Sequence, residues 1–295
     1  MAQCRIVRET PPTLRSALYA LDPAMPVLLR PDGAVQVGWD PRRAVLVHPP
    51  RDLTAAGLAT LLRSMRSWVP LNVLQRQAAD QGLVDAVELA DIVAQLVDAG
   101  VASRGPRQRP ARSASIRVHG RGPLSDLLME ALRCSGARIK RSSQPHAVAS
   151  AAGTDLVVLS DYLVADPRMV RDLRAEGVPH LPVRVRDGTG LVGPLVIPGV
   201  TSCLDCADLH RRDRDAAWPA LAAQLRDTVG TADRATLLAT AALALSQVNR
   251  VITAVRGLAE PDPGPPTALN ATLEFDVHAG SIVARQWTKH PQCSC

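Results

Sequence analysis

Aromatic side chains are scarce in this sequence: four Trp, two Tyr and one Phe make up 2% of its 295 residues. Proteins that bind single-stranded nucleic acids stack the bases on such rings, so this class is disfavoured. Lysine is also rare: Lys140 and Lys289 are the only two, and all other basic side chains of this kind are arginines. This preference for arginine over lysine is typical of a GC-rich bacterial genome. The net charge of +6 is therefore a weak sign of nucleic-acid binding.

The sequence also lacks the N-terminal apolar run of a signal peptide, and no stretch reaches the roughly 20 apolar residues of a membrane span. The alanine-rich segment Ala235 to Val255 includes Ser246, Gln247, Asn249 and Arg250, which predicts a buried helix with one polar stripe. Together with paired thiols, these absences predict a protein of the reducing cytoplasm with no membrane partner.

Two close cysteine pairs are the most informative feature that is present. Each pair is too tightly spaced for a comfortable internal disulfide, whereas four thiolates complete a tetrahedral structural zinc site. Zinc would tie the C-terminus to a distant segment; free thiols or disulfides are the alternative. His290 is expected either to support the site or to lie at the surface rather than to bind the metal, and Cys134 is expected to be a buried structural thiol. The predicted zinc ligands are Cys203, Cys206, Cys293 and Cys295.

Residues 1–102 show the pattern of a small α+β module. Three short strands, Val27–Arg30, Ala34–Trp39 and Ala44–Val47, predict a meander. Helical periodicity follows around Leu58 to Met65, around Leu71 to Ala79, and from a cap near Asp85 to Gly100. This is the outline of a winged helix, a fold that serves DNA binding or peptide binding.

Arg76 is the only cation of the candidate recognition helix, Pro70 to Asp80, which suits DNA phosphates poorly. We instead expect this module to capture a peptide by strand addition at an edge of the meander, formed by Val35–Trp39 or Ala44–Val47.

A linker rich in Pro, Gly, Ser and Arg is predicted at residues 103–114. Strand and helix patterns then alternate through residues 115–295, from a first strand at Ser115–His119 to a further strand at His180–Val185. Such alternation predicts a mostly parallel, doubly wound sheet, so the fold class is α/β.

The first strand of this domain leads into Gly120-Arg121-Gly122-Pro123-Leu124-Ser125, a nucleotide-binding loop with two of its three glycines. The acidic residue that would hold a ribose is missing, because Lys140, Arg141, Ser142 and Ser143 stand where it is expected. The loop therefore supports a Rossmann-like fold more strongly than it supports bound ATP and Mg²⁺.

The order of these features resembles the ThiF/MoeB-type adenylating superfamily. The motifs are the broken glycine loop, the run Gly193 to Gly199 leading into Cys203-Leu204-Asp205-Cys206, and the closing cysteine pair. More narrowly, the chain resembles the ThiF-like, leader-peptide-binding component of azoline-forming cyclodehydratases, which partner YcaO proteins.

That resemblance implies that the four cysteines bind structural zinc and that Gly120 and Gly122 belong to a nucleotide loop. It also implies that Asp161 stands near the position of a magnesium-binding aspartate, although a helix-capping role is the alternative. Homodimers are common in the superfamily, and in the peptide-modifying relatives the YcaO partner performs the ATP-dependent chemistry.

Three functions remain open at this point. The first is a scaffold that presents a leader peptide or partner protein to a YcaO-like enzyme and has a degenerate nucleotide site. The second is an active ATP-dependent adenylyltransferase, and the third is a zinc-containing winged-helix DNA-binding regulator. The run His210-Arg211-Arg212-Asp213-Arg214 either binds an anion or forms a charged helix end with internal salt bridges.

Overall fold

The computed structural model describes residues 17–83, 85–105, 112–143, 153–257 and 265–295, which form two compact units. The described part of the first unit ends at Gly105, and that of the second begins at Arg112. Strand β6 (Ala102–Gly105) carries the first unit three residues past its expected end at residue 102. Residues 106–111 of the predicted linker lie outside the described residues.

The described residues of the first unit form two small antiparallel sheets and three helices. The predicted meander is confirmed as a sheet with the order β2-β3-β4, and a second sheet has the order β5-β1-β6. The strands are β1 (Leu18–Leu21), β2 (Val27–Leu29), β3 (Val35–Val37), β4 (Val45–Val47), β5 (Val69–Pro70) and β6. The helices are α2 (Ala55–Ser64), α3 (Leu71–Ala79) and α4 (Ala86–Asp98).

Local capping explains where two of these helices start. The Thr54 side chain accepts a hydrogen bond from the Gly57 backbone N–H at 3.0 Å, and Asp85 accepts one from the Val87 N–H at 2.8 Å. Apolar residues spaced for a helix then face a single core, which includes Leu58, Leu61, Leu62, Leu74, Leu89 and Leu96.

One predicted peptide edge is wrong. Strand β3 lies between β2 and β4, so both of its sides are already hydrogen-bonded and Val35–Trp39 cannot accept an added strand. Among the described strands of this sheet, β2 and β4 form the edges. The second predicted segment, Ala44–Val47, therefore contains an edge strand.

A seven-stranded mixed sheet forms the centre of the second unit, with the order β13-β12-β11-β10-β9-β7-β8. The strands are β7 (Ser115–His119), β8 (Arg138–Ser142), β9 (Leu156–Ser160), β10 (His180–Arg186), β11 (Thr189–Val192), β12 (Ala271–Asp276) and β13 (Ser281–Gln286). Strands β8, β7, β9 and β10 are parallel, as the strand-helix alternation predicts.

The other half of the sheet corrects the expectation of a mostly parallel arrangement. Strands β10 and β11 are joined by Asp187 and Gly188, whose φ angles of 50° and 78° are both positive. A two-residue turn of this kind can only connect antiparallel strands, and β12 and β13 continue the antiparallel pairing.

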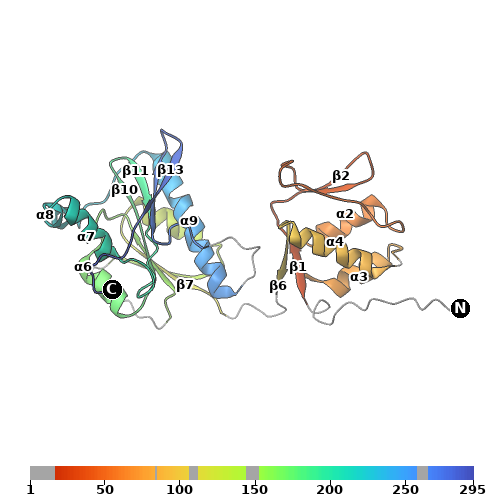
Figure 1. Ribbon diagram of the computed structural model, residues 1–295, viewed down its shortest axis with the longest axis horizontal. Coiled ribbons are helices and arrows are strands. Elements are labelled where there is room, and N and C mark those ends of the chain that lie inside the picture. The colour runs from red at the N-terminus through yellow and green to blue at the C-terminus, as the bar shows by residue number, and fades with distance from the viewer. Residues whose placement is uncertain (1–16, 84, 106–111, 144–152, 258–264) are drawn as a thin grey trace. The chain divides into compact units, whose positions relative to one another are not determined.

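Helices cover both faces of this sheet. They are α5 (Pro123–Leu132), α6 (Pro167–Ala175), α7 (Leu204–Arg214), α8 (Trp218–Leu225) and α9 (Arg234–Arg256). Helix α9 lies on one side of the sheet, and α6 to α8 lie on the other (Figure 1). One core joins α5 and α9 to the sheet, and a second core joins α6 to the start of α7.

The segment predicted as a buried helix with a polar stripe forms α9, which is buried only in part, since Leu238 for example is 46% exposed. By length and composition alone this helix is able to cross a membrane, but its buried residues pack on the central sheet. Gln247, from the predicted polar stripe, is 3% exposed. Its side-chain carbonyl accepts hydrogen bonds from the Ala268 N–H at 3.1 Å and the Thr267 hydroxyl at 3.2 Å, which fixes the segment before β12.

Replacement of Gln247 by leucine is expected to lower the free energy of unfolding by about 1–3 kcal/mol, because the buried Ala268 N–H loses its acceptor. Calorimetric unfolding measures the change. Asn249→Leu is the matched control, because Asn249 is exposed on the same helix and its replacement should change stability by less than about 0.5 kcal/mol. Equal effects of the two changes would contradict the role of Gln247.

Candidate functional site

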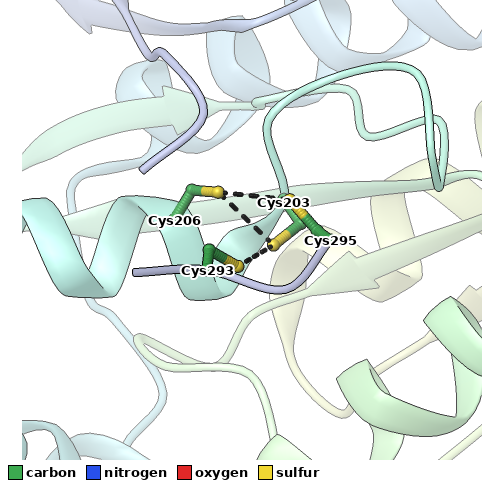
Figure 2. A group of neighbouring side chains, drawn as sticks. All are labelled: Cys203, Cys206, Cys293 and Cys295. Carbon is green, nitrogen blue, oxygen red and sulfur yellow. Dashed lines mark hydrogen bonds between the residues drawn. The ribbon is translucent and has the colours of Figure 1, made fainter. Parts of the chain in front are cut away.

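The four predicted metal ligands come together in space. Cys203 and Cys206 stand at the start of α7, and the other two thiols lie on the C-terminal segment (Figure 2). All four sulfur atoms lie within 4.8 Å of one another. Three sulfur pairs are separated by 3.8 Å (Cys203–Cys206), 3.5 Å (Cys203–Cys293) and 3.4 Å (Cys206–Cys295). A tetrahedron with zinc–sulfur bonds of about 2.3 Å has edges of about 3.8 Å, so the arrangement fits such a metal.

The state of the thiols agrees with metal binding and not with disulfides. All four are free, and the sulfur separations far exceed the roughly 2.05 Å of a disulfide. Burial raises the pKa of Cys203. Burial also opposes ionisation of Cys206, but hydrogen bonds from backbone N–H groups, that of His290 first, lower its pKa to about 7.

His290 supports the cluster from outside, as expected. Its backbone N–H donates a hydrogen bond to the Cys206 sulfur at 3.3 Å, and its Nε2 lies 2.8 Å from an Asp213 carboxylate oxygen. Cys134 differs from expectation, because it is exposed rather than buried. It lies just after the end of α5, whose buried side chains include Leu128 and Leu132.

The broken glycine loop is closed by a residue from a neighbouring strand. Asp161 follows β9, is 1% exposed, and has a positive φ of 76°. Its carboxylate accepts hydrogen bonds from the backbone N–H groups of Leu124 at 2.8 Å and Ser125 at 3.1 Å, and from the Ser125 hydroxyl. Asp161 therefore caps the N-terminus of α5, which is the alternative role considered for it.

This cap occupies the place where the loop would hold an anion. The first N–H groups of a helix and its dipole attract a phosphate in nucleotide-binding folds. Here those groups already face a carboxylate, and a Cβ added at Gly122 would lie 2.7 Å from an Asp161 oxygen. Burial raises the pKa of Asp161, against the effect of its three hydrogen bonds.

The neighbourhood expected to hold a ribose is also occupied. Ser142 accepts a hydrogen bond from Arg117 Nε at 2.9 Å and lies 3.0 Å from His119 Nδ1. The cavity beside it, lined by His119, Ser143 and Ser160 among others, has a volume of about 60 Å³. Pockets for small ligands usually enclose about 300–1,000 Å³, so this one is too small for ATP.

Sequence reasoning missed two features of this unit. The contact between Asp161 and Ser125 joins residues of different strand-helix connections, and no local pattern signals it. A larger cavity on the α7 side of the sheet, which contains Arg184, was also missed. The charged run at His210 to Arg214, which lies beside this cavity, was the one available signal.

The fold matches that of two kinds of solved enzyme. A heterocyclase in complex with substrate and cofactor matches with a TM-score of 0.64 at 16% identity, over 94% of this chain and 39% of the heterocyclase. The heterocyclase TruD matches with a TM-score of 0.63 at 16% identity, over 94% and 42%. MccB of E. coli, solved with ATP, matches with a TM-score of 0.59 at 12% identity, over 94% and 99%.

The chain therefore shares its fold with these heterocyclases and with MccB, as the resemblance seen in the sequence leads one to expect. The chain spans about two fifths of the length of these two heterocyclases. No protein-family model matches the sequence, and no curated protein matches it.

The purified protein is expected to bind one metal ion per chain at the four cysteines. Replacement of zinc by Co²⁺ should give the visible and thiolate charge-transfer absorption of a tetrahedral thiolate site, because all four donors are sulfur. Cys206→Ser should abolish this spectrum, whereas Cys134→Ser is the control and should leave it unchanged. A Co²⁺ spectrum that survives Cys206→Ser would contradict the assignment of the ligands.

Proposed function

We propose that this protein is a ThiF-like scaffold of cyclodehydratase type. It binds a leader peptide or partner protein in the cytoplasm and presents it to an ATP-using, YcaO-like enzyme that forms the heterocycle. Support comes from the fold, which matches two heterocyclases over 94% of this chain. The chain corresponds to about two fifths of those enzymes, so other sequence must supply the rest of their activity.

The observation that carries this proposal is the closed glycine loop. A presenting protein needs no nucleotide site of its own, and here the Asp161 carboxylate already uses the N–H groups that would hold a phosphate. The adjoining cavity of about 60 Å³ has no room for ATP. The nucleotide site, including Gly120, Gly122 and Asp161, is therefore vestigial in this proposal.

The metal at the four cysteines is zinc, in a structural role. Four thiolates fill a tetrahedral zinc shell and leave no open position for a substrate. Two of the ligands come from the C-terminal segment and two from the start of α7, so the ion would hold that segment against the body of the unit. Because metal binding is coupled to folding, its removal should loosen both elements.

The peptide binds by strand addition to β4 in the winged-helix-like first unit. Among the described strands of its sheet, β4 is an edge strand, so its outer backbone groups are open to another strand. Leu46, at its centre, is 52% exposed, and the nearby Trp39 is 81% exposed. Exposed apolar side chains beside an open edge suit a peptide that pairs through its backbone and buries alternate side chains.

The scaffold model predicts that calorimetric titration with Mg-ATP gives no binding by the folded, metal-loaded protein, because its helix N-terminus is already capped. A clear alternative exists, since MccB solved with ATP matches this chain over 99% of its own length. Micromolar ATP binding that Gly122→Asp abolishes, together with ATP–pyrophosphate exchange, would establish the adenylyltransferase instead.

Peptide capture is testable with matched variants of the full chain. Peptides that bind are first selected from a displayed library of random sequences, and their affinities are then measured for Leu46→Asp and Leu28→Asp. These two leucines share one face of the sheet but lie on opposite edge strands, β4 and β2. We expect Leu46→Asp to weaken binding at least tenfold, because it places a charge at the docked strand, and Leu28→Asp to have little effect. The reverse pattern would place the peptide site at β2. If neither variant binds the peptide more weakly, this sheet is not the binding site.

A further inference from the structure

A cavity of the second unit has no role in the proposed function. It has a volume of about 480 Å³ and lies between the sheet face of β10 to β13 and helices α7 and α8. This volume falls within the range of about 300–1,000 Å³ typical of small-molecule pockets. Apolar walls come from Leu163, Leu191 and Leu204, and from the two rings of Trp218 and Trp287.

Most of the charges in this cavity are paired. Glu274 accepts a hydrogen bond from Arg285 Nε at 2.9 Å and lies 3.7 Å from Arg186 Nη2. Arg211 donates to Asp208 at 2.7 Å. Its guanidinium also lies 5.1 Å from the centre of the Trp218 ring and 4.9 Å from that of Trp287. Glu274–Arg285 and Asp208–Arg211 are balanced pairs, and Arg186, which would add a third cation, is exposed, so water and salt screen its charge.

The remaining charged residues at the cavity divide by exposure. Asp205 is paired with Arg174 at 3.1 Å. Asp187, Arg214 and Asp215 are exposed, so water and salt screen their charges. They therefore do not set the charge that a ligand meets inside the cavity.

Arg184 differs from all of these residues. It stands at the middle of the sheet on β10, lines the cavity, and forms no ion pair or hydrogen bond with any described residue. The residue as a whole is partly exposed. Desolvation, followed by the repulsion of Arg211, lowers the pKa of Arg184 to about 10, against the attraction of Asp208. The side chain remains a cation at neutral pH and lacks a counter-ion.

We propose that this cavity binds a small organic monoanion and that Arg184 receives its carboxylate. An unpaired, partly buried charge destabilises a fold, and such a residue is understandable where a ligand supplies the missing partner. Arginine suits a carboxylate because its planar guanidinium donates two parallel hydrogen bonds. The inference is independent of the proposed scaffold function.

The same charges define what the ligand is. One uncompensated cation matches one negative charge, so a nucleotide triphosphate would bring several charges without partners. The leucine and tryptophan walls favour an apolar group next to the carboxylate. Such a ligand is either a free small acid or the C-terminal end of a peptide chain, because both carry a carboxylate next to an apolar group.

The test uses the metal-loaded full chain and the indole N–H signals in a ¹⁵N–¹H correlation spectrum. Trp218 and Trp287 line the cavity, and their N–H groups are held by Asp208 and Thr272, so their signals should respond to a ligand. Trp39 and Trp68 belong to the other unit and are internal references. N-acetyl-leucine is titrated against N-acetyl-leucinamide, which differs by the absence of the negative charge.

We expect the acid, but not the amide, to shift the Trp218 and Trp287 signals. Arg184→Gln should raise the dissociation constant at least tenfold, and Arg133→Gln, an exposed arginine on α5's end, should leave it unchanged. 4-Methylpentanoate has the same leucine-like side chain and carboxylate as N-acetyl-leucine but no amide group. If the two acids bind equally well, the site takes a free acid; if 4-methylpentanoate binds more weakly, the site takes the end of a peptide chain. Equal shifts from acid and amide, shifts that persist in Arg184→Gln, or no shift up to the solubility limit would each overturn the proposal.

The melting temperature of Arg184 variants is a second test, because an arginine that only stabilises the fold would give the opposite change. If Arg184 serves a ligand, Arg184→Leu should raise the melting temperature by roughly 2–4 °C, because it removes an unpaired charge. A melting temperature that falls by several degrees in both Arg184→Leu and Arg184→Gln would show that the side chain holds the fold together, and the proposal would fail.

Discussion

Four thiols hold the C-terminal segment against the first turn of α7, and much of the second unit depends on that contact. The segment carries His290 to the Cys206 sulfur and Trp287 to Thr272 and Arg211. Helix α7 in turn carries Asp208 and Arg211 to the open face of the sheet. A metal that neutralises closely spaced thiolates removes the repulsion that would separate these elements. The cysteine cluster is therefore both a fold constraint and the reason that a polar cavity exists beside the antiparallel half of the sheet.

The sequence predicted helices and strands well where residues that end such elements agreed with the apolar periodicity between them. Helix α3 has the predicted bounds, Leu71–Ala79, because Pro70 and the Gln81-Gly82 pair mark its ends and leucines repeat between them. The cysteine set was readable because metal ligation requires a residue type and spacing that few other features share. Strand β11 was hidden in a glycine-rich run, and β5 has only two residues, so neither carries a pattern long enough to identify. The central place of β3 was already implied by the predicted meander, whose second strand lies between the other two, so the expectation of an edge at Val35–Trp39 conflicted with that prediction.

The site was only partly predictable for the same reason. Gly120 and Gly122 are recognisable as a loop between strand and helix, but their function depends on what lies across the sheet from them. Asp161 reaches the helix N-terminus because β9 is the parallel neighbour of β7, so that the two strands end side by side. Sequence offered both a magnesium ligand and a helix cap for this residue, and only three-dimensional contacts give it the hydrogen-bond partners of a cap.

Asp161 and Arg184 together show how the unit treats buried charge. Asp161 directly follows β9, and Arg184 lies on the neighbouring strand β10. The Asp161 carboxylate has three hydrogen-bond donors, from Leu124 and Ser125, and they offset part of the cost of its burial. The guanidinium has no such partner among the described residues, although carboxylates stand close by and are engaged with other arginines. The unit therefore supplies hydrogen-bond partners for one buried charge and none, among the described residues, for the next. The unpaired charge of Arg184 therefore indicates where this unit binds a ligand, and the capped glycine loop at Asp161 indicates where it does not.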